Sequence, residues 1–146
     1  MNKRFFNIFN LTEEEAITLL DTPQDQIGED DSRYIAASHL VNFSTDSSIN
    51  ALMRAVQNTN PSLDNRIVRR KSVETLGRLQ ATQAMSVICT CLADEDCYTV
   101  ENAVWAIGEI GTKNIDILEE IAQLLEKPGQ IYRVILHTLA KLEYKG

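Results

Sequence analysis

The sequence contains little of what common catalytic sites are built from. It has only two histidines and three cysteines in 146 residues, and it carries no glycine-rich phosphate loop, no nucleophile elbow and no HExxH pair. These absences argue against a self-sufficient hydrolase or a metalloenzyme, and we expect no metal site. The chain also lacks a run of the roughly 20 apolar residues that span a bilayer, and its N-terminal segment turns acidic before a signal-like stretch develops. We therefore expect a cytoplasmic protein without membrane insertion.

Positive charge is also scarce. Fourteen Lys and Arg stand against 21 Asp and Glu, which gives a net charge of −7. Nucleic-acid backbones are bound by clustered cations, so this balance argues against DNA or RNA as a partner. Hydrophobic residues make up 44% of the chain, which is enough for a continuous core in a single domain.

The three cysteines, Cys89, Cys91 and Cys97, are an odd number in a chain of cytosolic character, so a disulfide framework is not expected. Cys89 and Cys91 point to different sides of a helix, and no CxxC or nearby histidine completes a zinc set. We interpret the three as structural, mostly buried thiols, with metal or redox duty as the alternative.

A helix-shaped block recurs four times along the chain. The blocks are IAASHLVNF (35–43), KSVETLGRL (71–79), NAVWAIGEI (102–110) and VILHTLAKL (134–142). Their central aliphatic residues, Leu40, Leu76, Ile107 and Leu139, follow one another at steps of 36, 31 and 32 residues. A period of about 30–45 residues with two helices per unit is typical of an α-solenoid.

Second amphipathic runs lie between these blocks, at 48–57, 82–93 and 114–125. Each repeat is therefore predicted to be a helical hairpin, with turns at the polar and proline-containing segments between the runs. The segment Asp94-Glu95-Asp96 is interpreted as such a turn, with N-capping potential for the helix that follows.

The N-terminal part differs from the repeats. The segment LTEEEAITLL (11–20) has a capping box, Thr12 with Glu15, but lacks the repeat pattern, and the polar stretch 21–31 is expected to be an exposed loop. We predict one all-α domain over 1–146, with an N-terminal cap and linker at 1–29 and HEAT-like repeats at 30–146. The last helix presents an apolar face, for which we expect a partner or self-association.

The repeat blocks resemble a known family. Val68-Arg69 before Ser72, the run Leu76-Gly77-Arg78-Leu79, and the run Ile107-Gly108-Glu109-Ile110 after Ala103 and Ala106 look like HEAT-like repeats. The segments DSRYIAASHLVNF, NRIVRRKSVETLGRL, CYTVENAVWAIGEIGT and YRVILHTLAKL are together similar to the E/F-type phycobiliprotein lyases of cyanobacteria. The similarity is greatest to the N-terminal part of the phycoerythrobilin lyase branch, and VENAVWAIGEIG is its most specific piece.

The resemblance implies an activity. It implies that the chain helps to attach an open-chain tetrapyrrole, phycoerythrobilin or phycocyanobilin, to a cysteine of a phycobiliprotein subunit, with phycoerythrin α as the expected client. The bilin is then a substrate, no cofactor is bound permanently, and the acceptor thiol belongs to the client. Members of that branch are longer than 146 residues, so we expect activity to require further repeats or a second lyase subunit. The competing hypothesis is a non-catalytic HEAT-repeat scaffold that binds phycobilisome proteins during assembly or degradation.

Candidate bilin-binding residues come from the helices that contain the recurring blocks, since the second helix of each HEAT-like hairpin is expected to line the concave side. A bilin needs cations for its two propionates, a carboxylate for its pyrrole N–H groups and a flat surface for stacking. Polar and aromatic positions at fixed offsets from the central aliphatic residues supply each type. The candidates are Tyr34, Arg70, Glu74, Arg78, Glu101, Trp105, Glu109, Arg133 and His137.

Each candidate has a plainer interpretation. The charged residues could form solvated ion pairs between repeats, each worth about 0–1 kcal/mol. Trp105 could anchor a ligand in the groove or pack beneath the next repeat. His137 fits a polar groove or packing position better than a general base, because no acidic partner lies at helical spacing on its own helix.

Overall fold

The computed structural model describes residues 10–146, which form eight α-helices joined by turns and short 3₁₀ segments. The α-helices are α1 (Glu13–Asp21), α2 (Arg33–His39), α3 (Asp46–Gln57), α4 (Leu63–Arg78), α5 (Met85–Thr90), α6 (Cys97–Ile110), α7 (Ile115–Gln123) and α8 (Tyr132–Lys141). None of the helices within this part of the chain combines the length and the apolar content that a membrane crossing requires.

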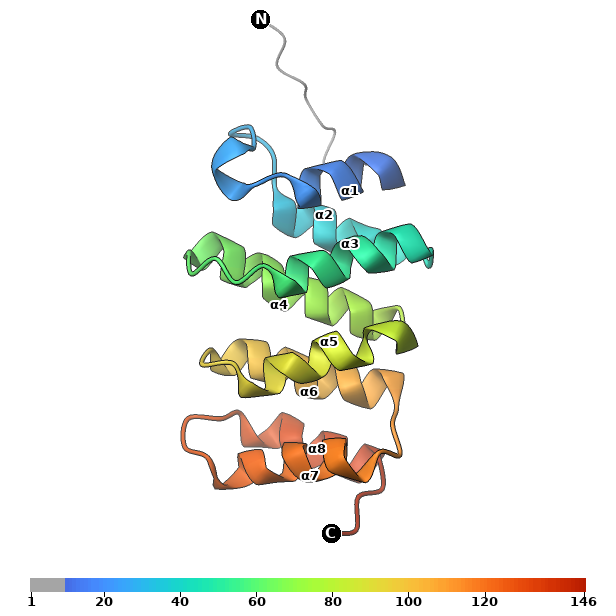
Figure 1. Cartoon of the computed structure of the whole chain (residues 1–146), viewed down its shortest axis with the longest axis vertical. Helices are drawn as coiled ribbons and strands as arrows, with labels where there is room; N and C mark the ends of the chain where they lie inside the picture. Colours follow the sequence, from blue (N-terminus) through green and yellow to red (C-terminus); the bar gives the residue numbers. More distant parts are fainter. Residues whose placement is uncertain (1–9) are drawn as a thin grey trace, which may run out of the picture.

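The helices stack in two layers (Figure 1). We call α1, α3, α5 and α7 the first-helix layer, and α2, α4, α6 and α8 the second-helix layer. Each first helix packs antiparallel to the second helix that follows it, and the second helices also pack on one another from α2 through α4 and α6 to α8. This arrangement confirms the predicted α-solenoid of HEAT-like hairpins.

The central aliphatic residues of the four blocks lie in the core between the layers. Leu40, Leu76 and Ile107 are fully buried, and Leu139 is 7% exposed. All four belong to a single cluster of buried hydrophobic residues, so the core is continuous along the stack. Burial of an aliphatic side chain of this size stabilises a fold by about 1.5–3 kcal/mol.

Short polar side chains begin most of the helices. Thr12 and Glu15 form the predicted capping box at the start of α1. The side-chain oxygens of Ser32, Thr45 and Ser62 accept hydrogen bonds from the backbone at the starts of α2, α3 and α4. These contacts satisfy amide groups that a helix start leaves without intrahelical partners.

Two buried arginines tie α1 to α2 and α3 to α4. The Nε atom of Arg33 in α2 donates to the Leu20 carbonyl at 3.1 Å, and the Nε atom of Arg69 in α4 donates to the Val56 carbonyl at 2.9 Å. Both carbonyls lie in the last turn of the preceding helix, where C=O groups lack intrahelical partners. The first two hairpins are thus joined by the same contact, although the α1 sequence lacks the repeat pattern.

A glycine allows α4 and α6 to approach closely. A Cβ atom at Gly77 would lie 2.8 Å from the Ala106 Cβ and 2.9 Å from the Trp105 Cζ3. A larger residue at position 77 would therefore force the two helices apart. The contact between α6 and α8 is looser, since the three atoms nearest to a Cβ at Gly108 would all belong to the Thr138 side chain, at 3.0 Å and beyond.

The predicted run 82–93 forms a broken element and not one regular helix. Its α-helical part, Met85–Thr90, is flanked by 3₁₀ turns at Thr82–Ala84 and Cys91–Ala93. The 3₁₀ turns lie at the two ends of the segment, where the chain arrives from α4 and leaves toward α6.

Candidate functional site

A pocket of about 520 Å³ opens on the second-helix layer where α4, α6 and α8 meet. This volume lies within the range of about 300–1,000 Å³ that is common for small-molecule sites. Its lining consists of Glu74, Arg78, Glu101, Asn102, Trp105, Ile131, Arg133, Val134 and His137. Residues from three repeats, distant in sequence, therefore share one concavity.

Most of the candidate residues lie in this pocket. Glu74, Arg78, Glu101, Trp105, Arg133 and His137 line it. Tyr34, Arg70 and Glu109 do not, and they are described below. Sequence reasoning missed Asn102, Ile131 and Val134, because only positions at fixed offsets from the central aliphatic residues were considered.

The Glu74 carboxylate is shared between two cations of its own helix. One oxygen contacts Lys71 Nζ, and the other lies 3.3 Å from a terminal nitrogen of Arg78. Burial raises the pKa of Glu74, but the hydrogen bonds from Lys71 and Arg78 outweigh burial, and the pKa lies below its ordinary value. Glu74 is therefore ionised at neutral pH and already neutralised by its neighbours.

Trp105 has both a packing contact and an exposed surface. Its ring edge lies against the backbone at Gly77, and its side chain is partly buried on the core. The Arg78 guanidinium carbon lies 5.7 Å from the ring centroid, within the range of a cation–π contact. The indole is thus held in a defined orientation at the pocket wall, so both interpretations of this residue describe part of its environment.

Three polar side chains of the pocket are without partners. Glu101 is half-buried and Arg133 and His137 are exposed, and none of the three makes a side-chain hydrogen bond or ion pair with another residue of 10–146. An unpaired carboxylate and an unpaired guanidinium in one concavity remain available to a ligand that offers both N–H donors and an anionic group.

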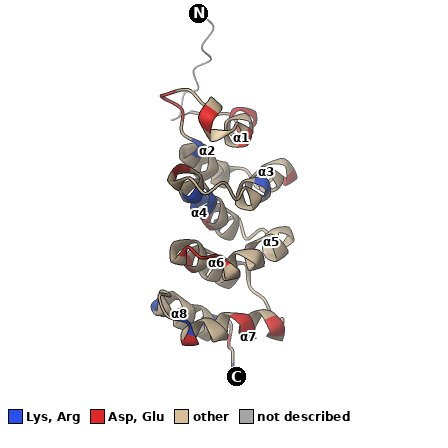
Figure 2. Ribbon diagram, turned by 60° about the vertical axis from the view of Figure 1, so that its left-hand side comes forward, with Lys and Arg blue, Asp and Glu red and all other residues tan. Residues whose placement is uncertain are grey.

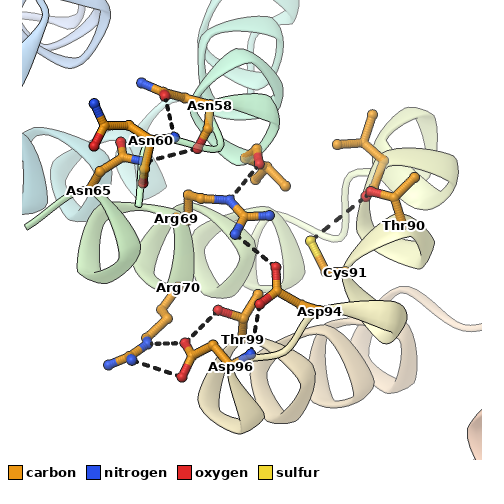
Figure 3. Close-up of polar contacts among 12 residues, drawn as sticks. Asn58, Asn60, Asn65, Arg69, Arg70, Thr90, Cys91, Asp94, Asp96 and Thr99 are labelled. Carbon is orange, nitrogen blue, oxygen red and sulfur yellow. Dashed lines mark hydrogen bonds and ion pairs between the residues drawn. The ribbon is translucent and has the colours of Figure 1, made fainter. Parts of the chain in front are cut away.

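The Arg70 side chain points toward α6 and is engaged there. Its guanidinium donates to both carboxylate oxygens of Asp96, at 2.7 and 3.0 Å, and its Cζ lies 4.9 Å from the Tyr98 ring centroid. Burial raises the pKa of Asp96, but hydrogen bonds from Arg70 and Thr99 outweigh it and lower the pKa overall. Figure 3 shows this network.

The preceding residue, Arg69, makes a parallel contact with the same turn. Its guanidinium donates to Asp94 at 2.8 Å and to the Val56 carbonyl (Figure 3). We call Arg69, Arg70, Asp94 and Asp96 the inter-repeat clamp, because two adjacent arginines of α4 bind two carboxylates in the turn before α6. As inferred for the Asp94-Glu95-Asp96 turn, Asp96 occupies the N-cap position of α6, although its carboxylate is engaged mainly by Arg70 and the Thr99 hydroxyl.

Glu109 and Tyr34 also lie away from the pocket. Glu109 accepts from Lys141 Nζ at 3.0 Å and so forms an ion pair between α6 and α8. Such an ion pair between repeats is the plainer interpretation given above for the charged candidate residues. The Tyr34 ring lies 5.0 Å from Lys71 Nζ and is 41% exposed. We call Tyr34, Arg70, Lys71 and Tyr98 the tyrosine strip, which crosses α2, α4 and α6 beside the pocket.

The cysteines have different environments. Cys91 is buried and its Sγ contacts the Val87 carbonyl, whereas Cys89 and Cys97 are half-buried. Burial, with smaller contributions from Glu120 and Cys91, raises the pKa of Cys89 to about 11, and burial also raises the pKa of Cys91. Thiols of this kind are poor nucleophiles at neutral pH. Within residues 10–146, no group of three or more His, Cys, Asp or Glu side chains is placed to hold a metal ion.

Charge is divided between the two layers (Figure 2). The second-helix layer carries eight Lys and Arg against four Asp and Glu, and five of those cations lie on α4. The first-helix layer carries one Arg against eight Asp and Glu, mainly on α1 and α7. Most Lys and Arg of the helices therefore lie in the second-helix layer, where Arg33 and Arg69 are buried and Arg70 and Lys71 are paired with Asp96 and Glu74.

Comparison with known proteins supports the repeat assignment. Residues 62–133 match the family described as HEAT repeats. The chain is 68% identical over 145 residues to the "Uncharacterized phycocyanin operon protein Y" of Pseudanabaena tenuis (strain PCC 7409), which covers 99% of this chain and 34% of that protein. It is 31% identical over 110 residues to the "Bilin biosynthesis protein CpeY" of Synechococcus sp. (strain WH8020), which covers 75% of this chain and 26% of that protein.

A solved structure has the same fold. It is the complex of CpcE and CpcF of phycocyanin lyase from Nostoc sp. PCC7120, which matches with a TM-score of 0.72 and 23% identity over 97% of this chain and 58% of the matched chain. The chain spans about a third or less of the length of the two curated relatives. The structural likeness at this identity concerns the solenoid fold.

Proposed function

We propose that this HEAT-repeat chain, similar in sequence to a bilin biosynthesis protein, binds an open-chain tetrapyrrole in the pocket between α4, α6 and α8. We further propose that it takes part in attaching this bilin to a cysteine of a phycobiliprotein subunit. One observation carries the proposal: cations, a free carboxylate and an oriented indole from three repeats line a single concavity.

The pocket residues can be matched to the chemical groups of a bilin. Arg133 makes no ion pair within residues 10–146, and Arg78 reaches Glu74 through one 3.3 Å contact that leaves its other donors available, so these two would bind the propionates. Glu101 would accept from the pyrrole N–H groups, because the charge of Glu74 is already neutralised on its own helix. Trp105 would stack on the conjugated system.

The chain would act by positioning and not by nucleophilic attack. In the proposed reaction the client cysteine thiolate adds to the ethylidene carbon of the bilin A ring, one C–S bond forms, and a proton returns to the tetrapyrrole, so no group leaves. Holding a flexible tetrapyrrole and a thiol at attack distance lowers the entropic part of the barrier. The raised pKa values of Cys89 and Cys91 fit this division of roles, since neither thiol is activated.

We propose phycoerythrobilin as the bilin and the phycoerythrin α-subunit as the client, with phycocyanobilin and the phycocyanin α-subunit as the comparison pair. We also propose that attachment requires a second lyase subunit or further repeats. The matched solved structure is itself a complex of two lyase subunits, and the curated relatives are longer than this chain.

The proposed binding of the bilin is tested by titrating phycoerythrobilin into the purified chain and following the absorbance of the bilin. The double variant E101Q and W105A should bind at least tenfold more weakly, because it loses the free carboxylate and the stacking surface. I115A is the matched control, since Ile115 is exposed on the first-helix layer and does not line the pocket. Equal affinity of the double variant and the control would remove the pocket as the bilin site.

The attachment half is tested by co-production with phycoerythrobilin and an apo-phycoerythrin α-subunit, followed by a zinc-fluorescence gel. Covalently coloured α-subunit supports a lyase role. Co-purification of an uncoloured subunit, with the second lyase subunit also present, would instead favour a scaffold that handles no chromophore.

A further inference from the structure

The helix α8 exposes a large apolar side chain at a position that is buried in every other repeat. Counted from the central aliphatic residue of each block, the position three residues earlier holds Ala37, Val73, Val104 and Leu136. The first three are 0% exposed, whereas Leu136 is 57% exposed. The face of α8 that contains Leu136 therefore lacks the cover that the same face has in α2, α4 and α6.

The residues one turn before and one turn after Leu136 show the same difference. Tyr132 is 40% exposed, whereas its counterparts in the three earlier repeats are at most 8% exposed. Ala140 is exposed, whereas its counterparts in α4 and α6 are buried. A spacing of four residues places all three on one face of α8, and we call Tyr132, Leu136 and Ala140 the terminal face. The buried counterparts are Arg33, Arg69 and Val100 for Tyr132, and Gly77 and Gly108 for Ala140.

Within the stack, the second helix of the next hairpin covers this face. Gly77 lies against Ala106 of α6, and Gly108 lies against Thr138 of α8. Each contact joins the residue after one central aliphatic residue to a short residue just before the next one. Ala140 continues this series on α8, and it is the only member without a second helix against it. A helix of the same kind, with a short side chain at the contact position, is therefore what the terminal face fits.

The stacking direction argues against a second copy of this chain as the occupant. Neighbouring second helices run parallel, since their contacts join equivalent positions, as in the ion pair of Lys141 with Glu109. A twofold axis cannot reproduce this stacking, because it either reverses the α8 of the copy or places its α7 on the wrong side. A head-to-tail copy would present α2, where His39 occupies the contact position. The His39 Nε2 atom already lies 2.6 Å from the Leu11 carbonyl oxygen, so this position is covered by the copy itself.

We infer that the terminal face is the docking surface for a second polypeptide, which adds a HEAT-type hairpin to the stack with its second helix parallel to α8. The contact position of that helix holds a residue of about the size of alanine or threonine. This inference deepens the proposed function and rests on it, because it gives the second polypeptide required for attachment its surface on this chain. Arg133 and His137 of the pocket are direct neighbours of Tyr132 and Leu136 in the sequence, so the added hairpin extends the layer in which the pocket lies.

The test uses a relative as the source of the second polypeptide. The matched region covers 34% of the Pseudanabaena tenuis protein, and the probe is the unmatched part of that protein, produced as a separate polypeptide. Its binding to the immobilised chain is measured by surface plasmon resonance. L136E should bind the probe at least tenfold more weakly than the native chain, because a carboxylate then lies in the apolar contact. L63E is the matched control, since Leu63 is 58% exposed at the start of α4 and lies outside the terminal face.

A second variant separates a close helix contact from unspecific association. A140L adds apolar surface, so it should strengthen any unspecific hydrophobic association. In a close helix contact of the kind made at Gly77, the larger side chain should instead weaken binding about tenfold or more. Circular dichroism and thermal unfolding check that L136E and A140L keep the fold, which is expected because both positions are exposed.

The possible results separate this inference from the proposed function. Equal affinity of L136E and the native chain for the probe would overturn the docking surface, and so would the absence of any binding by the native chain. Tighter binding by A140L would overturn the parallel helix contact. A homodimer that L136E abolishes, without binding of the probe, would assign the face to a second copy of this chain and overturn the inference as well. Failure of the native chain to bind phycoerythrobilin, with probe binding lost in L136E and kept in L63E, would remove the pocket as the bilin site and leave the docking surface standing.

Discussion

Replacement of Gly77 by alanine probes the contact between α4 and α6 directly. In an unconstrained helix, a Gly to Ala change stabilises by about 1 kcal/mol through helix propensity. At this site the added Cβ would lie 2.8 Å from the Ala106 Cβ, 2.9 Å from the Ala106 Cα and 2.9 Å from the Trp105 Cζ3. Two of these atoms are fixed to the backbone of α6, so the clash cannot be relieved by rotating a flexible side chain.

The size of the effect follows from these two opposing contributions. Overpacking of a close helix contact typically costs about 1–3 kcal/mol, and three contacts below 3.0 Å favour the upper part of that range. After the propensity gain is subtracted, we expect G77A to lower the free energy of unfolding by about 1–2 kcal/mol. For a chain of this length this corresponds to a fall in Tm of about 2–8 °C.

Two measurements check this expectation. Thermal unfolding gives the loss of stability, and fluorescence reports on the pocket wall because Trp105 is the only tryptophan of the sequence. We expect the emission of G77A to shift as the ring moves away from position 77. G108A is the matched control, since its Cβ would meet only Thr138 side-chain atoms, at 3.0 Å and beyond, and a stability change within about 0.5 kcal/mol of zero is expected. A G77A variant as stable as the native chain, with unchanged emission, would refute the close α4–α6 contact.

Three further predictions concern the inter-repeat clamp and the thiols. The variant D96N should be less stable than the native chain at pH 7 by about 1–3 kcal/mol, because Arg70 loses its charged partner. The folded-state pKa of Asp96 lies below the ordinary value of 3.8, so the stability that ionised Asp96 contributes is present above pH 3.8 and is lost as the pH falls through the folded-state pKa. Urea titrations of the two proteins should therefore converge below about pH 4. The variant R69K keeps the charge but cannot contact both the Val56 carbonyl and Asp94, so we expect a loss of about 1–3 kcal/mol that a conservative exchange at exposed Arg66 does not produce. Iodoacetamide at about pH 7.5 should label Cys97 before Cys89 and Cys91 in the native chain, as judged by peptide mass spectrometry, because the pKa of Cys89 is raised to about 11 and Cys91 is buried; equal labelling of all three without denaturant would contradict the described packing.

The repeat architecture could be predicted because it is encoded by hydrophobic spacing. Leu40, Leu76 and Ile107 are fully buried as their periodicity indicates, and the Thr12 capping box forms as its spacing indicates. Such features are local or strictly periodic, so the sequence alone reveals them.

The polar contacts between repeats were harder to predict. Arg70 was expected to face a ligand, yet it binds Asp96, which lies 26 residues further along the chain in the turn before the next second helix. The position of a residue relative to the central aliphatic residue of its helix predicts the helix face on which it lies. It does not predict which turn of the next repeat the side chain contacts. The pattern of two adjacent arginines in one repeat followed by two carboxylates at the start of the next is the signal that could have identified the clamp.

Most charged side chains of α4 are engaged in contacts within the fold, and this limits how the pocket wall on α4 can vary. Arg69 and Arg70 hold the α4–α6 interface together, and Glu74 is neutralised by its own helix, so α4 contributes a largely fixed wall. The unpaired groups, by contrast, come from α6 and α8. Because Glu101, Arg133 and His137 make no side-chain hydrogen bond or ion pair within residues 10–146, we expect that they can be replaced at little cost to the fold. Binding preference among bilins should therefore be altered most readily by substitutions on α6 and α8, with α4 left unchanged.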